Sequence, residues 1–263
     1  GNASPTPSLE HDFFKNVLRD QRAIWTSPFH IHRDQAYWLL PFAGVTAALL
    51  ASDSATAEDG GEFAASGSHQ KISDRISSFG TIYVPAAVVG SLYLVGRITG
   101  NNKARETAVL AAEAALDTEI VGESLKLILN RQRPSASDGE GEFWSRGSSF
   151  PSGHSFEAWS IATVIANEYH DHLWVEITAY AGATLVSASR FTGHHHYLSD
   201  ILVGSAIGYG IGRYVYRNHH QTPGGSDSGT HHILAKIKSR LAMAPIYAPA
   251  VRTYGGSLSY VLW

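Results

Sequence analysis

Two long uncharged stretches limit what this chain can fold into. Residues 36–52 carry no charged side chain, and neither do residues 76–96, which lie between Arg75 and Arg97. About 20 apolar residues in a helix are enough to cross a bilayer, so the second stretch is long enough and the first is marginal. The mean hydropathy of −0.10 is nevertheless low for a protein with several membrane spans. The sequence therefore favours a soluble or peripheral protein, with an integral membrane protein as the alternative.

Helical periodicity predicts the rest of the architecture up to residue 217. Asp12–Arg22 mixes apolar and charged residues as an amphipathic helix does, packed either on its own domain or on a membrane surface. Residues 53–68 are rich in Gly, Ala, Ser and acids and predict a loop. The fold class expected is mainly α, a bundle of about six principal helices. Further helical runs cover residues 106–130, 155–169, 173–189 and 200–216.

The predicted organisation has one main domain followed by a distinct C-terminal part. Gly, Ser and His become frequent after residue 217, and apolar residues alternate near the end of the chain, as in a strand. A small β-hairpin with strands in 246–251 and 254–263 is therefore expected beside the bundle. The predicted parts are a flexible lead (1–10), a single helical domain (11–217, with a motif-bearing core at 106–217), a mobile linker (218–232) and a helix-and-hairpin appendage (233–263).

Composition excludes several classes of function. The net charge of −3 provides no basic surplus for nucleic acid. The absence of cysteine excludes disulfides, thiolate metal sites and a cysteine nucleophile. The first residues lack the basic and apolar segments of a signal peptide, which fits either a cytoplasmic protein or a chain from which a signal has been removed.

The first of three short motifs is Lys126-x6-Arg133-Pro134. Two helical turns separate the two cations, so on one helix they would face the same way until Pro134 ends it. An arginine fork can hold two phosphate oxygens, and a lysine adds a compact charge. Taken alone, the pair is more typical of a solvated helix face than of a phosphate site, and Arg131 in the same segment is assigned to that face.

The second motif, Pro151-Ser152-Gly153-His154, precedes a predicted helix. Amide donors at a helix N-terminus bind anions, and glycine allows the backbone to come close. Ser152 can add a hydroxyl donor. His154 can protonate a departing oxygen, although a single histidine at this position is more often a cap.

The third motif is Ser189-Arg190-x5-His196-x3-Asp200. His196 and Asp200 have the i, i+4 spacing of neighbours on a helix face, where a carboxylate can fix the tautomer of a histidine. His196 could then attack phosphorus through its other nitrogen. His194 and His195 are assigned to the pocket rim, because adjacent side chains diverge and no His-x3-His pairing completes a metal site.

In this order and spacing the three motifs resemble the type 2 phosphatidic acid phosphatase superfamily, which also includes vanadium haloperoxidases. The resemblance covers about residues 126–217. It implies a metal-independent phosphatase in which His196 is the nucleophile, Asp200 orients it and His154 is the general acid. The implied phosphate-binding residues are Lys126, Arg133, Ser152, Gly153 and Arg190. No cofactor is implied, and vanadate is expected to inhibit.

The resemblance leaves two alternatives, a vanadate-dependent haloperoxidase and a non-catalytic phospholipid-binding or transport protein. The full set of His154, His196 and Asp200 favours an enzyme, because a binding protein needs neither an acid nor a nucleophile. The expected partner is a phosphate ester, with a lipid or prenyl phosphate suggested by the uncharged stretches and a membrane surface as the place where it is met. The family's bacterial members usually work outside the cytoplasmic membrane, so an extracytoplasmic, periplasmic location is expected.

Overall fold

The computed structural model describes residues 9–30, 33–65, 67–78, 83–136, 140–220, 241–248 and 253–260. It divides the chain into two compact units, residues 1–220 and 221–263. The first unit is helical throughout its described elements, which confirms the mainly α fold class. Its helices are α1 (Leu9–Thr26), α2 (Arg33–Ala65), α3 (Gly67–Ser78), α4 (Tyr83–Thr99), α5 (Asn102–Leu129), α6 (Gly153–Glu168), α7 (Leu173–Thr192) and α8 (Leu198–His219), with short 3-10 turns at Ser27–His30 and Pro134–Ala136.

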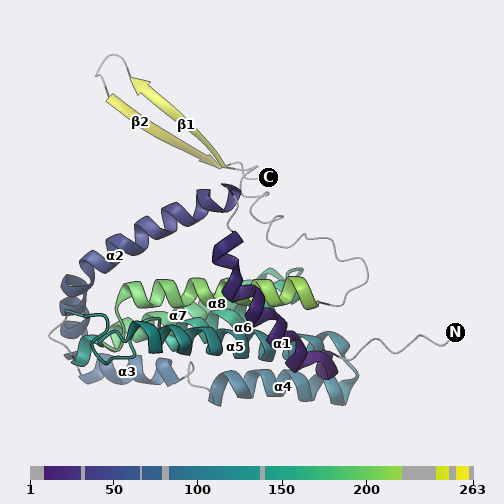
Figure 1. The fold of residues 1–263 in the computed structure, drawn as a ribbon. Helices are drawn as coiled ribbons and strands as arrows, with labels where there is room; N and C mark the ends of the chain where they lie inside the picture. Colours follow the sequence, from purple (N-terminus) through teal and green to yellow (C-terminus); the bar gives the residue numbers. More distant parts are fainter. Residues whose placement is uncertain are drawn as a thin grey trace. The chain divides into compact units, whose positions relative to one another are not determined.

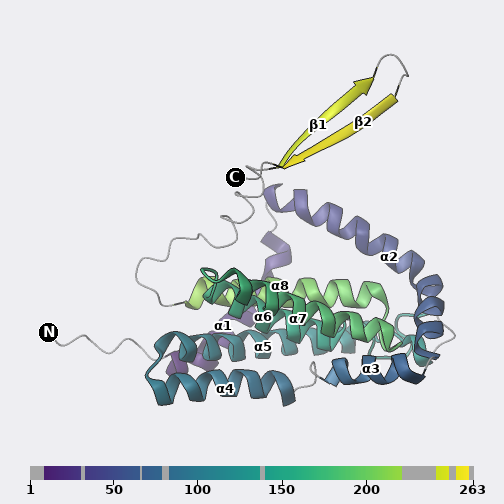
Figure 2. The same ribbon diagram turned by 180° about the vertical axis from the view of Figure 1, so that it is seen from behind.

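Helices α5, α6, α7 and α8 lie side by side and form the centre of the bundle, with α4 along α5 (Figures 1 and 2). The apolar core joins α5, α6 and α8, because each of these helices presents small and branched apolar residues to the others. Its fully buried members include Leu110, Val164 and Val215. The bundle holds the ends of α5, α6, α7 and α8 in fixed relation, and these ends carry the three motifs.

Two glycines of α8 let it approach α6 more closely than other residues allow. A Cβ at Gly208 would lie 2.1 Å from the carbonyl oxygen of Phe156, and one at Gly204 would lie 2.7 Å from that of Ser152. These contacts involve backbone, so no side-chain movement can relieve them. The four-residue spacing of Gly204 and Gly208 therefore allows close helix packing.

Helix α1 packs on the bundle through one face, against α5 and α8. Val17, Asn16 and Asp20 are buried, while Phe14 and Leu18 remain more than 70% exposed. The buried face of α1 therefore includes polar side chains, and two large apolar side chains, Phe14 and Leu18, are exposed. Such a face suits contact with a membrane surface.

The loop predicted for residues 53–68 is wrong, because helix α2 continues to Ala65 and α3 begins at Gly67. The many alanines of this segment favour a helix, and its glycines are used for packing. A Cβ at Gly60 would lie 3.4 Å from the ring of Phe191, and one at Gly61 would lie 3.2 Å from His194. The second half of α2 thus rests on the end of α7.

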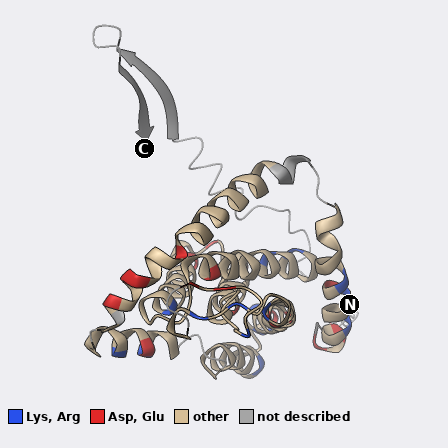
Figure 3. Cartoon of the chain, turned by 60° about the vertical axis from the view of Figure 1, so that its left-hand side comes forward, with Lys and Arg blue, Asp and Glu red and all other residues tan. Residues whose placement is uncertain are grey.

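The first half of α2 carries no charged residue between 37 and 52 and exposes large apolar side chains such as Trp38 and Leu40. Figure 3 shows the acidic residues of α2 gathered on its other half. Two segments are long and apolar enough to cross a membrane: Tyr37–Phe63 within α2, and Gly67–Thr99, which contains α3, α4 and the residues between them that the structure does not describe. Of their most apolar stretches, 6% and 14% are buried. Exposed apolar surface of this extent indicates association with a membrane.

In the second unit, β1 (Leu241–Ala248) and β2 (Thr253–Tyr260) pair antiparallel, with Leu241 opposite Tyr260. The hairpin begins at Leu241 rather than at residue 246 as expected. The predicted helix at 233–242 lies outside the described residues except for its last two, which belong to β1. The linker predicted at 218–232 also falls largely outside them, while Asn218 and His219 belong to α8.

Candidate active site

The first motif lies where α5 ends. Asn130 adopts a left-handed conformation (φ 45°), its backbone N–H donates to the carbonyl of Lys126 and its side-chain amide donates to that of Leu127, so α5 stops at Leu129. Lys126 is in the last turn of α5, but Arg133 lies beyond the helix. The expectation that both cations lie on one helix face, ended by Pro134, is therefore wrong. Asparagine tolerates the left-handed region, and this ends the helix earlier.

A loop after this motif folds back on it. The amides of Ser145 and Gly147 donate to the carbonyl of Asn130, and that of Ser149 donates to the carbonyl of Arg131 at 2.9 Å. Gly147 is required here, since a Cβ would lie 1.9 Å from the Arg131 carbonyl oxygen. The loop thereby delivers Ser149, fully buried, to the third motif.

The second motif forms the start of α6. Ser152 is the N-cap and Gly153 is the first helical residue, so the helix begins two residues earlier than predicted. A Cβ at Gly153 would lie 2.9 Å from Nζ of Lys126, which shows how closely the lysine ammonium approaches the backbone of this motif. The buried hydroxyl of Ser152 accepts a hydrogen bond from the hydroxyl of Ser155 at 3.0 Å. The backbone N–H of Ser152 donates to the carbonyl of Asp200. His154 is half-buried in the first turn of α6.

The third motif spans a tight turn between α7 and α8. Arg190 is in the last turn of α7, and its carbonyl accepts from the amides of both His195 and His196. His194 adopts a left-handed conformation with φ of 56°, which histidine tolerates better than most residues. The turn therefore brings Arg190 and His196 together although five residues separate them.

His196 is buried, and its ring is fixed through Nδ1. This nitrogen lies 2.7 Å from the carbonyl oxygen of Ser149 and 3.6 Å from Oδ2 of Asp200. A carbonyl can only accept, so Nδ1 carries the proton and Nε2 carries the lone pair. The tautomer expected of a nucleophilic histidine is therefore set mainly by Ser149, with Asp200 next to it.

Asp200 reaches His196 by a different route from the one predicted. Helix α8 begins at Leu198, so His196 precedes the helix and does not share a helix face with Asp200. The Asp200 carboxylate instead turns back over the helix start, where Oδ2 accepts from the amide of Tyr197 at 3.0 Å and from the Ser149 hydroxyl at 2.5 Å. A carboxylate at a helix N-terminus is stabilised by this capping geometry.

Arg131, assigned from the sequence to a solvated surface, is instead buried at the centre of a network. Its guanidinium donates to Asp200 at 2.6 Å, to Asp53 at 2.8 Å and to the Ser199 hydroxyl at 2.7 Å. It also lies over the ring of Tyr197 at 4.1 Å. This residue joins α2 to α8 and holds Asp200 in place. Neither Arg131 nor Asp53 was identified from the sequence, because Asp53 was assigned to a loop far from the motifs.

Helix α3 supplies two further contacts that sequence reasoning missed. The Ser77 hydroxyl contacts the Arg190 guanidinium, and Asp74 lies 3.4 Å from Nε2 of His195. Asp74 lies between the predicted loop and the uncharged stretch 76–96, and Ser77 lies inside that stretch, so no motif marks either residue. Helix α3 thus contacts both Arg190 and His195.

The electrostatics show that the residues of the three motifs share one site. Burial, followed by the charges of Arg190, His196, Lys126 and His195, lowers the pKa of His154 to about 3. Burial also lowers the pKa of His196, with help from the nearby arginines and against the opposing effect of Asp200. For Arg190, burial and Arg133 lower the pKa to about 10. Cations that disfavour one another's charge in this way form a site prepared for a multiply charged anion.

Asp200 keeps its charge in these surroundings. Burial favours its neutral form, but hydrogen bonds and the charges of His196 and Arg131 outweigh burial, so the pKa of Asp200 is lowered. A cavity of about 660 Å³ opens beside Lys126 and Arg133 and is also lined by Arg146. The site thus combines an ionised carboxylate behind His196 with cations in front of it.

Comparison with known proteins agrees with this arrangement. The PAP2 superfamily model matches residues 107–223, a range that contains every motif residue. A lipid A 1-phosphatase from Porphyromonas gingivalis is 35% identical over 69 residues, which are 26% of this chain and 16% of that protein. The chain therefore spans far less than the full length of this curated relative.

Two solved structures match this chain, one of them over most of its length. The transmembrane PAP2 type phosphatidylglycerolphosphate phosphatase from Bacillus subtilis has a TM-score of 0.53 at 18% identity, over 82% of this chain and 98% of that one. LpxE from Aquifex aeolicus has a TM-score of 0.45 at 25% identity, over 56% of this chain and 85% of that one. The first likeness extends the agreement from the motifs to the helical architecture.

Proposed function

We propose that this chain, whose residues 107–223 match the PAP2 superfamily model, is a metal-independent phosphatase acting on a lipid or prenyl phosphate through a phosphohistidine. The observation that carries the proposal is the position of His196. Its Nδ1 is held by the Ser149 carbonyl, and its remaining lone pair belongs to Nε2, close to Arg190 and Arg133.

In the proposed first step, Lys126, Arg133 and Arg190 bind the nonbridging oxygens, and the amides at the start of α6 add donors. Nε2 of His196 forms a bond to phosphorus as the bond to the leaving oxygen breaks. His154 donates a proton to that oxygen. The imidazolium character that develops on His196 is stabilised by Asp200, which Arg131 and Ser149 hold in place.

In the second step water attacks the phosphohistidine, and His154 now accepts the proton of that water. The P–N bond breaks, phosphate leaves and Nε2 regains its lone pair. His154 must be protonated for the first step, although burial and the surrounding cations lower its pKa to about 3 in the absence of an anion. A bound phosphate dianion offsets these cations, so substrate binding itself favours the protonated acid.

The lipid nature of the substrate is supported by the apolar surface of the protein and by its relatives. Helices α2 and α4 expose large apolar side chains, so a substrate held in a membrane would meet the protein there. The curated relative is a lipid A 1-phosphatase. We place the site on the periplasmic side, where an anchored lipid phosphate can be reached from the membrane surface.

The test combines chelation, vanadate and substrate choice. Phosphate release from a lipid phosphate should survive treatment with EDTA, and vanadate should inhibit it competitively, because vanadate resembles the phosphoryl transition state. Loss of the chemical step on chelation, restored by a divalent ion, would contradict the mechanism. Halide oxidation with peroxide and vanadate, without phosphate release, would identify the haloperoxidase alternative instead.

A further inference from the structure

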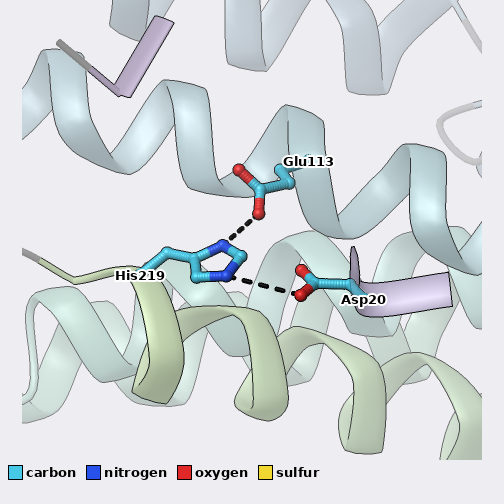
Figure 4. A group of neighbouring side chains, drawn as sticks. All are labelled: Asp20, Glu113 and His219. Carbon is cyan, nitrogen blue, oxygen red and sulfur yellow. Dashed lines mark hydrogen bonds and ion pairs between the residues drawn. The ribbon is translucent and has the colours of Figure 1, made fainter. Parts of the chain in front are cut away.

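A second cluster of ionisable side chains lies near the other end of α8. Asp20 of α1, Glu113 of α5 and His219 of α8 meet there, and one ligand atom of each lies within 4.8 Å of those of the other two (Figure 4). All three are buried. His219 is 19 residues beyond Asp200 on the same helix, a separation of roughly 28 Å at 1.5 Å per residue. The cluster is therefore separate from the proposed active site.

Both nitrogens of His219 face a carboxylate. Nδ1 contacts Oε1 of Glu113, and Nε2 lies 3.4 Å from Oδ1 of Asp20. Figure 4 shows the imidazole ring between the two carboxylates. A carboxylate on one ring nitrogen, with the other nitrogen facing a second oxygen ligand, is how proteins orient a histidine that binds a metal ion.

The cluster has more buried negative groups than the described side chains satisfy. Oε2 of Glu113 is buried without a hydrogen bond, as is Oδ2 of Asp117 one turn further along α5. Asp20 is buried with His219 and the neutral Tyr214 as hydrogen-bond partners, and Glu113 with His219 and the neutral Asn16. Three carboxylates thus gather around one imidazole, and buried carboxylate oxygens without donors are costly unless a cation is present.

Arg19 is the cation nearest to His219. Its guanidinium donates to Asn16 at 2.7 Å and lies 3.2 Å from Nε2 of His219. The contact with Arg19 needs a lone pair on Nε2 and the contact with Asp20 needs a proton there, so an ion that binds Nε2 replaces the guanidinium and displaces that proton. Arg19 is exposed and reaches the cluster from the surface, so its long side chain can move away when an ion enters.

We propose that Asp20 and Nε2 of His219 bind a divalent transition-metal ion, Mn²⁺ or Zn²⁺. Glu113 orients the imidazole. One imidazole with several carboxylates and no thiolate suits these ions. The ion fastens α1 to α5 and α8, and it takes no part in phosphoryl transfer at the distant site.

The first test measures binding to the full-length protein without a polyhistidine tag, after removal of metal. Isothermal titration with Zn²⁺ alone and with Mn²⁺ alone should show one saturable ion per chain for at least one of them, and Mg²⁺ should bind more weakly. Asp20→Asn and His219→Ala should each weaken binding at least about tenfold, the usual consequence of losing a metal-site residue. The matched control is His170→Ala, because His170 belongs to neither cluster of metal-ligating side chains and its ring lies beside Asp171 instead.

Arg19→Ala gives a measurement that does not depend on the folding of the cluster variants. Since Arg19 competes with the ion for Nε2, this variant should bind the metal as tightly as the wild type or more tightly. The bound ion should also raise the melting temperature of the wild type and not that of Asp20→Asn. Absence of saturable binding in the wild type, unchanged affinity in Asp20→Asn, or loss of binding in Arg19→Ala would overturn the proposal.

Phosphatase activity of the same samples separates this inference from the proposed function. Below the melting temperature of the metal-free protein, metal-free and metal-loaded samples should hydrolyse substrate equally. Activity without metal binding would refute the metal site alone. Metal binding with activity only in the loaded sample would uphold the site and refute the metal-independent mechanism.

Discussion

His196 and His219 lie near the two ends of α8 and make a natural comparison. Each is buried, and each has carboxylates beside it. At the first, burial and the nearby arginines lower the pKa of His196 despite Asp200. At the second, burial acts in the same direction, but contacts with Asp20 and Glu113 outweigh it and raise the pKa of His219 to about 9.

The comparison teaches that a histidine–carboxylate pair does not define a function by itself. The His196 end gathers Lys126, Arg133 and Arg190, so it attracts an anion. The His219 end gathers carboxylates, so it attracts a cation. The surrounding charges decide whether the imidazole serves as a nucleophile toward phosphorus or as part of a cation site.

The largest effect should come from removing the nucleophile. We expect His196→Ala to reduce turnover at least about 10⁴-fold on every substrate, because no other group can form the covalent intermediate. His154→Ala should lose about 10²- to 10⁴-fold on alkyl phosphates but much less on aryl phosphates, whose leaving groups hardly need a proton. Steady-state turnover rates of the two variants on an alkyl phosphate and on an aryl phosphate measure both effects.

His195→Ala is the matched control for these variants, since His195 is adjacent to the nucleophile and is assigned to the rim. It should retain most activity. Equal and complete loss on aryl and alkyl phosphates in both His154→Ala and His196→Ala would contradict the division between acid and nucleophile.

The next effect separates orientation of the nucleophile from binding of phosphate. Asp200→Asn should reduce kcat about 10²- to 10⁴-fold while leaving vanadate inhibition nearly unchanged, since Asp200 contacts His196 and not the ligand. Arg190→Lys keeps the charge but loses the planar fork, so it should weaken vanadate binding. If Asp200→Asn loses vanadate affinity as severely as Arg190→Lys, the two roles are wrongly assigned.

Arg131 tests whether the carboxylate behind His196 needs its own support. Arg131→Met leaves Asp53 and Asp200 buried without their common partner, which should cost about 3–5 kcal/mol of stability. Thermal unfolding in identical buffer and detergent measures this, with Arg146→Met, an exposed arginine of the neighbouring loop, as control. Adding Asp53→Asn to Arg131→Met should recover part of the loss. Independent, additive losses would mean that the two residues do not form a pair.

The smallest effect concerns proton uptake at the anion site. The pKa of His154 is about 3 in the free protein, lowered by burial and then by Arg190, His196, Lys126 and His195. A bound vanadate offsets these cations and raises that pKa, so binding takes up a proton and the affinity should fall as the pH rises above about 4. Vanadate also titrates, so the His154→Ala profile is the reference. If vanadate affinity changes with pH in the same way in the wild type and in His154→Ala, then His154 takes up no proton on binding.

The site residues that lie within the three motifs could be predicted, because each motif combines residue types suited to phosphate chemistry at a short, fixed spacing. The order of Lys126, Ser152–His154 and Arg190–Asp200 was enough to predict the anion site, and the structure brings these residues together. The helical runs were also predictable, since their apolar periodicity extends over many residues.

The supporting residues could not be predicted, because tertiary packing determines their partners. Arg131 resembles any cation near a helix end until Asp53 of α2 and Asp200 of α8 surround it. His219 belongs by composition to a polar tail, and only the extension of α8 buries it against α1 and α5. The partners in such charge pairs are far apart in the sequence, so no short sequence pattern identifies them.

The measurement that tests the central claim most directly is trapping of the covalent intermediate. The protein is mixed with a ³²P-labelled substrate, quenched with base or denaturant within one turnover and digested for peptide mapping. The account predicts an acid-labile, base-stable label on His196, with accumulation changed in His154→Ala and absent in His196→Ala. A label on another residue, or turnover without any label while His196→Ala stays active, would contradict it.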